Sequence, residues 1–243
     1  MKPVNRITPW IAASLLALAG ASSQAQDAVG ICGGLGNSFG PFDYRDHAGS
    51  QDFKVNSNNP LRLVHIAHFR PEMEMLIRGG QGEKSDIGPE FDYTLRAFPN
   101  HHRALMALVR LSDKQQGAEK PKGMRYTVDC WFTRALQWRP DDVMVRMIYA
   151  SYLGSRNRNN DAMEQLKVAT SLAKDNALTH NNIGLIYFDL KAYDKALEQD
   201  HRATELGLAR PTLRERLTAI GRWQEPGAAP ASAASAAASA ASN

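Results

Sequence analysis

The sequence predicts an all-α protein, a short helical-repeat solenoid of about three helix pairs with a capping helix and an irregular N-terminal segment. Two observations predict this fold class. The chain resembles itself at an offset of 34 residues, which aligns Ala162 with Ala196 and Ala169 with Ala203. Each copy also contains two stretches whose apolar residues recur at the spacing of a helix face. Helix pairs that recur at this period bury their apolar faces by stacking on one another.

The two ends of the chain are expected to lie outside the repeat array. Lys2 and Arg6 precede an apolar run that starts at Trp10, and small residues at Ser23 and Ala25 have the spacing that a signal peptidase recognises. We therefore expect a signal peptide at residues 1–25 and an exported, periplasmic location. The Ala/Ser-rich stretch 225–243 lacks charged and aromatic side chains over most of its length, which predicts a disordered tail.

The first part of the mature chain, residues 26–99, is expected to be an irregular segment packed on the repeats. Its stretch "LRLVHIAHF", residues 61–69, has β-branched, alternating character and is interpreted as a strand or an extended segment. The stretch "PEMEMLIRGG", residues 71–80, has Pro and Glu in its first turn and Gly at its end, which predicts a short helix.

The repeat domain is expected at residues 100–224. Its predicted helix pairs are 101–112 with 127–138, 143–154 with 160–173, and 178–190 with 193–206, and the stretch 210–223 is the capping helix. Gly184 and Ala196 are expected where the two helices of the last pair cross, because closely approaching axes need small side chains. Ala203 leaves room for the next unit.

The last unit resembles a tetratricopeptide repeat. Gly184, Tyr187, Tyr193, Ala196 and Ala203 fall on the signature positions of that family, and the period of 34 residues is the same. The phrases "GPFDYR" and "GPEFDYT" also resemble a group of exported proteobacterial repeat proteins. Automated labels in that group include transporter permease, but this sequence has no apolar stretch downstream of residue 25 long enough to span a membrane.

The resemblance implies a groove lined by the first helix of each pair, which binds a protein or peptide without catalysis. The groove candidates are Met147, Ser151, Ser155, Asn181, Asn182, Leu185, Phe188 and Asp189. Asn182 matches one position of the family's clamp for a C-terminal carboxylate, whereas Met147 and Ser151 stand where the clamp uses Lys and Asn. A chaperone-tail function is therefore not expected, and a role in cell-envelope or secretion assembly is the expectation. The partner and the oligomeric state are left open.

The two cysteines of the predicted mature chain, Cys32 and Cys130, are expected to form a disulfide, because an even number of cysteines in an exported protein favours pairing. A pair of buried free thiols is the alternative. The formal net charge of +4 falls to +2 without Lys2 and Arg6, and no block of basic residues favours nucleic-acid binding.

Two alternatives to a scaffold place chemistry in the N-terminal segment. The first is a small-ligand or metal carrier that uses the histidines at positions 65, 68, 101 and 102. Because an extended segment directs His65 and His68 to opposite sides, no metal site and no cofactor are predicted. Asn100 is expected to cap a helix in which His101 and His102 are first-turn residues. The second alternative is a hydrolase-type enzyme that uses Asp43 and Asp92.

Overall fold

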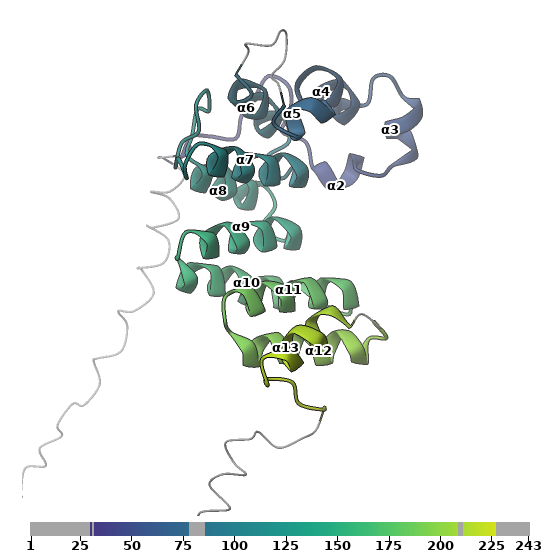
Figure 1. Cartoon of the computed structure of the whole chain (residues 1–243). Helices are drawn as coiled ribbons and strands as arrows, with labels where there is room; N and C mark the ends of the chain where they lie inside the picture. The colour runs from purple at the N-terminus through teal and green to yellow at the C-terminus, as the bar shows by residue number, and fades with distance from the viewer. Residues whose placement is uncertain (1–29, 31, 78–85, 209–210, 227–243) are drawn as a thin grey trace, which may run out of the picture.

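The fold is all-helical across the part of the chain that the structure, a computed structural model, describes: residues 30, 32–77, 86–208 and 211–226. Its helices stack in adjacent pairs into an elongated array (Figure 1). The predicted fold class is therefore confirmed. The predicted signal peptide and most of the predicted tail lie outside the described residues. Among the described residues, no helix has the length and hydropathy of a membrane span.

The six repeat helices begin and end within a few residues of their predicted bounds. They are α7 (His102–Lys114), α8 (Val128–Trp138), α9 (Val143–Ser155), α10 (Asn159–Ala173), α11 (Ala177–Asp189) and α12 (Tyr193–Glu205), followed by the capping helix α13 (Thr212–Ala219). Side chains cap four of these helices at the N-terminus: His101, Thr127, Asp142 and Asn176 each accept a hydrogen bond from the backbone N–H three residues later.

Each connection between the two helices of a pair contains one non-glycine residue with left-handed backbone. These residues are Gln116, Asn157 and Lys191, with φ angles of 59°, 59° and 61°. Asn adopts this conformation readily, whereas Gln and Lys do so less often. The first helix of each pair therefore ends in the same way, although the α7–α8 connection (residues 115–127) is longer than the other two.

The N-terminal segment is helical rather than irregular. It forms α2 (Tyr44–His47), α3 (Gln51–Val55), α4 (Pro60–His68), α5 (Pro71–Glu74) and α6 (Gly88–Ala97). The interpretation of 61–69 as a strand or extended segment is wrong. The Asn59 side chain accepts from the backbone N–H of Leu61 and Arg62, Pro60 occupies the first helical position, and Leu61 and Val64 are buried one turn apart. The short helix predicted over 71–80 is confirmed in part, as α5.

Two apolar clusters hold the array together. The larger one runs through the repeats and includes α6 through Phe91 and Leu95. The smaller one joins α2 and α4 to the end of α6 and consists of Tyr44, Leu61, Val64, Ala97 and Phe98. Residues 32–77, with helices α2 to α5, are here called the N-terminal module. The module packs on the repeat stack, since its Phe69, Met73 and Leu76 belong to the larger cluster.

The small residues of the last repeat lie at close helix contacts. Ala196 and Ala203 are buried, and a Cβ atom added to Gly184 would lie 3.1 Å from the Cβ of Gln199 on α12. The same atom would lie 2.5 Å from a methyl group of Leu213 on the capping helix. Gly184 therefore gives room to α13 as well as to α12.

The predicted disulfide between Cys32 and Cys130 is confirmed and joins the start of the N-terminal module to α8. Beside it, the buried Arg134 side chain donates hydrogen bonds to the carbonyl oxygens of Cys32, Gly33 and Gly34, at 3.0, 3.0 and 2.7 Å. One guanidinium group therefore satisfies three successive backbone acceptors, at the point where the chain leaves a helical residue, Cys32, and continues without regular structure.

Candidate binding groove

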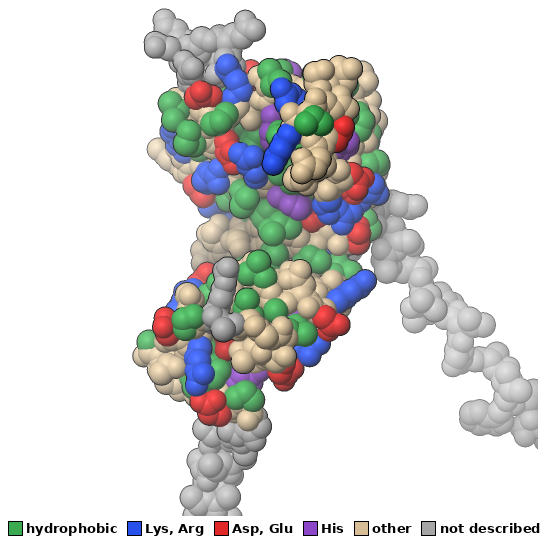
Figure 2. All heavy atoms as spheres, turned by 90° about the vertical axis from the view of Figure 1, so that its right-hand side faces the viewer, with side chains coloured by type: hydrophobic (Ala, Val, Ile, Leu, Met, Phe, Trp, Pro, Cys, Tyr) green, Lys and Arg blue, Asp and Glu red, His purple; other side chains and the backbone are tan. Residues whose placement is uncertain are grey.

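An apolar pocket of about 270 Å³ lies between the first helices of the last two repeats. It is lined by Met144, Met147, Ile148 and Ser151 of α9 and by Asn182, Leu185 and Ile186 of α11. None of these residues is charged. Figure 2 shows hydrophobic side chains gathered at the narrow waist between the two broader parts of the molecule.

The two polar side chains of this pocket have unused hydrogen-bonding capacity. The Asn182 side-chain oxygen accepts from Asn181 at 3.3 Å, but the Asn182 amide donors have no acceptor within the described residues. The Ser151 hydroxyl likewise has no partner there. One amide and one hydroxyl are thus available to the backbone of a bound segment, beside apolar side chains that could contact its side chains.

The structure brings four of the predicted groove residues together in this pocket: Met147, Ser151, Asn182 and Leu185. Ser155 and Asp189 line a neighbouring hollow of about 440 Å³, which Ser151 also borders. Asp189 forms an ion pair with Arg216 of α13 at 2.6 Å.

The remaining two predicted residues face elsewhere. Asn181 is buried, and the Phe188 ring lies under the guanidinium of Arg216, at 4.2 Å, and against Tyr193. The sequence reasoning missed Met144, Ile148 and Ile186. Met144 could have been found, because an offset of 34 aligns it with Leu178 and both are exposed apolar residues.

On α7 the corresponding row of residues is already occupied by the chain itself. Counted from each N-cap, Arg103, Arg110 and Lys114 of α7 correspond to Met144, Ser151 and Ser155 of α9. The Arg103 guanidinium binds the carboxylate of Glu74, Arg110 donates to the Glu74 carbonyl at 3.1 Å, and Lys114 donates to the Leu76 carbonyl at 2.9 Å. The open part of the first-helix face is therefore formed by α9 and α11.

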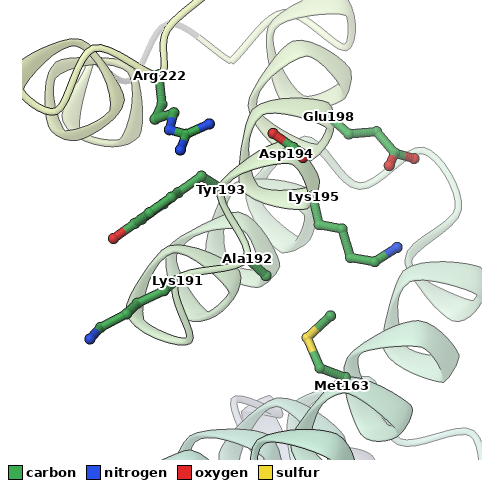
Figure 3. Close-up of a pocket in the computed structure, with 8 residues that line it drawn as sticks. All are labelled: Met163, Lys191, Ala192, Tyr193, Asp194, Lys195, Glu198 and Arg222. Carbon is green, nitrogen blue, oxygen red and sulfur yellow. The ribbon is translucent and has the colours of Figure 1, made fainter. Parts of the chain in front are cut away.

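A larger hollow, about 510 Å³, lies where α11 turns into α12 (Figure 3). Its charged side chains include Lys191, Lys195, Glu198 and Arg222. In Figure 3, Lys191 extends to one side of the start of α12, whereas Lys195 and Glu198 extend to the other. Because these groups diverge, they do not converge on a single ligand atom, and the hollow is a weaker candidate than the apolar pocket.

A buried polar junction connects the N-terminal module to the repeats. Asn100 accepts from the backbone N–H of Tyr44 and donates to the carboxylates of Asp43 and Asp142, at 2.7 and 2.9 Å. Asn100 is therefore not the N-cap of α7; His101 takes that place. His102 contacts the Asp142 carboxylate at 2.9 Å.

Both carboxyl groups of this junction are held in the ionised form. Burial alone would raise the pKa of Asp43, but hydrogen bonds from Arg45, Asn100 and Arg139 outweigh it and leave the pKa well below its usual range. For Asp142, burial likewise opposes hydrogen bonds from His102, Asn100 and the Val145 N–H, and the net effect lowers the pKa. The junction is a satisfied structural network.

The residues of the two alternative functions are dispersed. His65 contacts His101 with 2.8 Å between their Nε2 atoms, whereas His68 binds Glu90 at 2.7 Å. Within the described residues, no group of three or more His, Cys, Asp or Glu side chains is arranged to hold a metal ion. Asp92 binds Arg96 and the Arg125 N–H, partners that Asp43 does not share.

Comparisons with models of protein families, with curated proteins and with solved structures find no match to this chain.

Proposed function

We propose that this protein is a non-catalytic scaffold of the tetratricopeptide type, exported to the periplasm, whose α9–α11 face binds a segment of a partner protein. The observation that carries the proposal is the apolar pocket between α9 and α11. It contains the Ser151 hydroxyl and the Asn182 amide donors, which have no hydrogen-bond partner within the described residues. The disulfide is compatible with an oxidising compartment. A role in assembly of the cell envelope or of a secretion complex fits this location.

The chemistry of the pocket indicates the kind of segment that fits. The α7 row, which has three cationic side chains, holds a segment through the Glu74 carboxylate and through backbone carbonyls. In the α9 row the corresponding residues, Met144, Ser151 and Ser155, are neutral. An uncharged segment with aliphatic side chains therefore suits the open pocket, because burying a charge there without a counter-charge would cost free energy.

The experiment compares two double variants. Met144→Ala with Asn182→Ala truncates the pocket, and Met163→Ala with Asn160→Ala makes the same changes on α10 as a matched control. Proteins captured from a periplasmic extract are identified, purified and titrated calorimetrically. We expect the pocket variant to weaken binding about tenfold or more, since two contacts of about 1 kcal/mol each are lost, while the control binds like the wild type.

Binding through this pocket should also depend little on salt, because the contact lacks charged residues. Equal affinity of both double variants, or affinity that falls steeply between low and high salt, would contradict the proposal. Circular dichroism of each variant checks that a loss of binding does not reflect a loss of fold.

A further inference from the structure

The N-terminal module is joined to the repeats by a direct contact between two imidazole rings. His65, on α4, lies with its Nε2 atom 2.8 Å from the Nε2 atom of His101, the N-cap of α7. His101 is completely buried, and its ring packs against Tyr44 and Phe69, with centroids 4.2 and 4.7 Å away.

The cap fixes the tautomer of both rings. The backbone N–H of Ala104 donates to Nδ1 of His101 at 3.1 Å, so Nδ1 carries no proton and the neutral ring carries its proton on Nε2. This Nε2–H must then donate to Nε2 of His65, which leaves the His65 proton on Nδ1. A single chain of hydrogen bonds therefore runs from Ala104 through His101 to His65.

Protonation of either ring breaks this chain. If His65 takes up a proton, two N–H groups face each other across the 2.8 Å contact. His101 can relieve that clash only by moving its own proton to Nδ1, where it would meet the Ala104 N–H. A proton added to His101 meets the same N–H and places a positive charge at the N-terminus of α7, which the helix dipole disfavours.

The surroundings keep both rings neutral at pH 7. Burial lowers the pKa of His65 to about 4, and the nearby Arg103 of α7 acts in the same direction, whereas Glu74 of α5 opposes it. For His101, burial lowers the pKa well below its usual value, and His65, Arg103 and His102 add to the effect. The phenol of Tyr44 on α2 also lies against His101, and burial raises its pKa, so it is neutral here.

We propose that the His65–His101 hydrogen bond is an acid-sensitive latch that holds α4 on the repeat stack and releases it reversibly in acid, while the junction around Asn100 keeps α2 in place. The disulfide at Cys32 keeps the start of the N-terminal module attached, and α6 keeps its place through Phe91 and Leu95 in the main core. Opening is therefore local and uncovers the rings of Phe69 and Phe98, which are buried when the latch is closed.

The direction of the pH effect follows from the lowered pKa values. An unfolded histidine titrates near 6.5, so as pH falls below that value the open state gains protons that the closed state does not take up. The closed state loses stability progressively until the pH reaches the folded value, about 4 for His65.

The test uses nuclear magnetic resonance on the full chain with its disulfide intact. Long-range ¹H–¹⁵N spectra of the imidazoles near pH 7 should show His101 as the Nε2–H tautomer and His65 as the Nδ1–H tautomer. On acidification towards pH 4, amide signals of α4 should change while those of α11 stay constant, and the change should reverse on return to neutral pH. An Nδ1–H tautomer of His101, or simultaneous loss of the α4 and α11 signals, would overturn the proposal.

Two variants separate the latch from general acid effects. His65→Gln retains an acceptor for the His101 Nε2–H but does not titrate, so opening should shift to lower pH. His201→Gln, on α12 and in contact with the Gln224 carbonyl, is the control histidine away from the module and should open like the wild type. If both variants open at the wild-type pH, the latch does not exist; if His65→Gln fails to fold, the tautomer measurement on the wild type still decides.

Discussion

Single residues show where this chain departs from an ideal repeat. Asp200 is buried with 4% of its surface exposed, at a position that aligns with the buried Leu166 of the preceding repeat. It has no hydrogen-bond or ion-pair partner within the described residues. Burial raises its pKa, and the opposing electrostatic effect of His201 and Arg214 is smaller than that of burial. An ionised carboxylate at this place costs free energy at neutral pH.

We expect Asp200→Asn to raise the free energy of unfolding near pH 7 by about 1 kcal/mol, because it removes a buried charge without changing the shape. The gain should shrink as the pH falls from 7 towards 4, because burial raises the pKa of Asp200 and the folded protein takes up this proton before the unfolded chain does. Urea unfolding at both pH values measures the effect. Glu198→Gln, exposed on the same helix, is the control, and an equal gain from it would contradict the explanation.

Asp142 shows the opposite case, a buried carboxylate whose partners are all present. It caps α9 and binds Asn100 and His102. We expect Asp142→Ala to lower the free energy of unfolding by about 3 kcal/mol, because the cap is lost and the buried Asn100 and the half-buried His102 each lose an acceptor.

The neighbouring Asp141→Ala should cost less than about 1 kcal/mol, since its ion pair with Arg45 is exposed. Chemical denaturation of the two variants side by side tests this pair. Similar losses from both would mean that the junction does not depend on Asp142.

At the scale of the helices, spacing along the chain predicted the repeats because their signals are local. Caps such as Asp142 and Asn176 and the small residues Gly184 and Ala196 lie within the element that they specify. The segment 61–69 was misjudged because a nine-residue stretch with alternating apolar residues fits both a strand and one face of a short helix. The residue Asn59, which caps α4, is the signal in the sequence that favours a helix over a strand here.

The contact between α11 and α12 makes a prediction at this scale. Ala196 is fully buried, and its carbonyl oxygen would lie 3.3 Å from a Cβ atom at Gly184. We expect Ala196→Leu to lower the free energy of unfolding by about 1–3 kcal/mol, because the larger side chain forces the two helices apart. Ala219→Leu, exposed on α13, should leave the thermal midpoint nearly unchanged. If Ala196→Leu leaves the free energy of unfolding unchanged, α11 and α12 can move apart without a loss of stability, which would contradict this prediction.

At the scale of the whole molecule, the disulfide and the polar junction join parts that are distant in sequence. The pairing of Cys32 with Cys130 was predictable because only two cysteines were available. The junction of Asp43, Asn100 and Asp142 was not, since its members come from segments with no common pattern. Four of the eight predicted groove residues line the apolar pocket. Two of the others, Phe188 and Asp189, contact Arg216 of α13, and the repeat period does not encode how that helix packs.

Reduction of the disulfide should lower the free energy of unfolding by about 2–5 kcal/mol, because it releases a crosslink between residues 98 apart in the chain. Guanidinium unfolding with and without reductant measures this loss. Binding at the α9–α11 pocket should be the same in the reduced and oxidised folded protein, since the bridge joins residue 32 to α8 and all residues of the pocket lie on other helices. A reduced protein that is equally stable would show that packing on the repeats and the hydrogen bonds from Arg134 hold the N-terminal module without the covalent bond.

The occupation of α7 by the α5 segment sets a length for whatever fills the open face. Because the α5 segment covers the residues of α7, the open part of the first-helix face consists of α9 and α11. Packed helices lie about 8–10 Å apart, so this open surface extends for roughly 20 Å across the stack. An extended chain advances about 3.3 Å per residue, which limits an extended occupant to about six residues in contact. If this face binds an extended peptide as proposed, residues beyond that span make no further contact, and the affinity of a peptide series of increasing length should become constant near six residues.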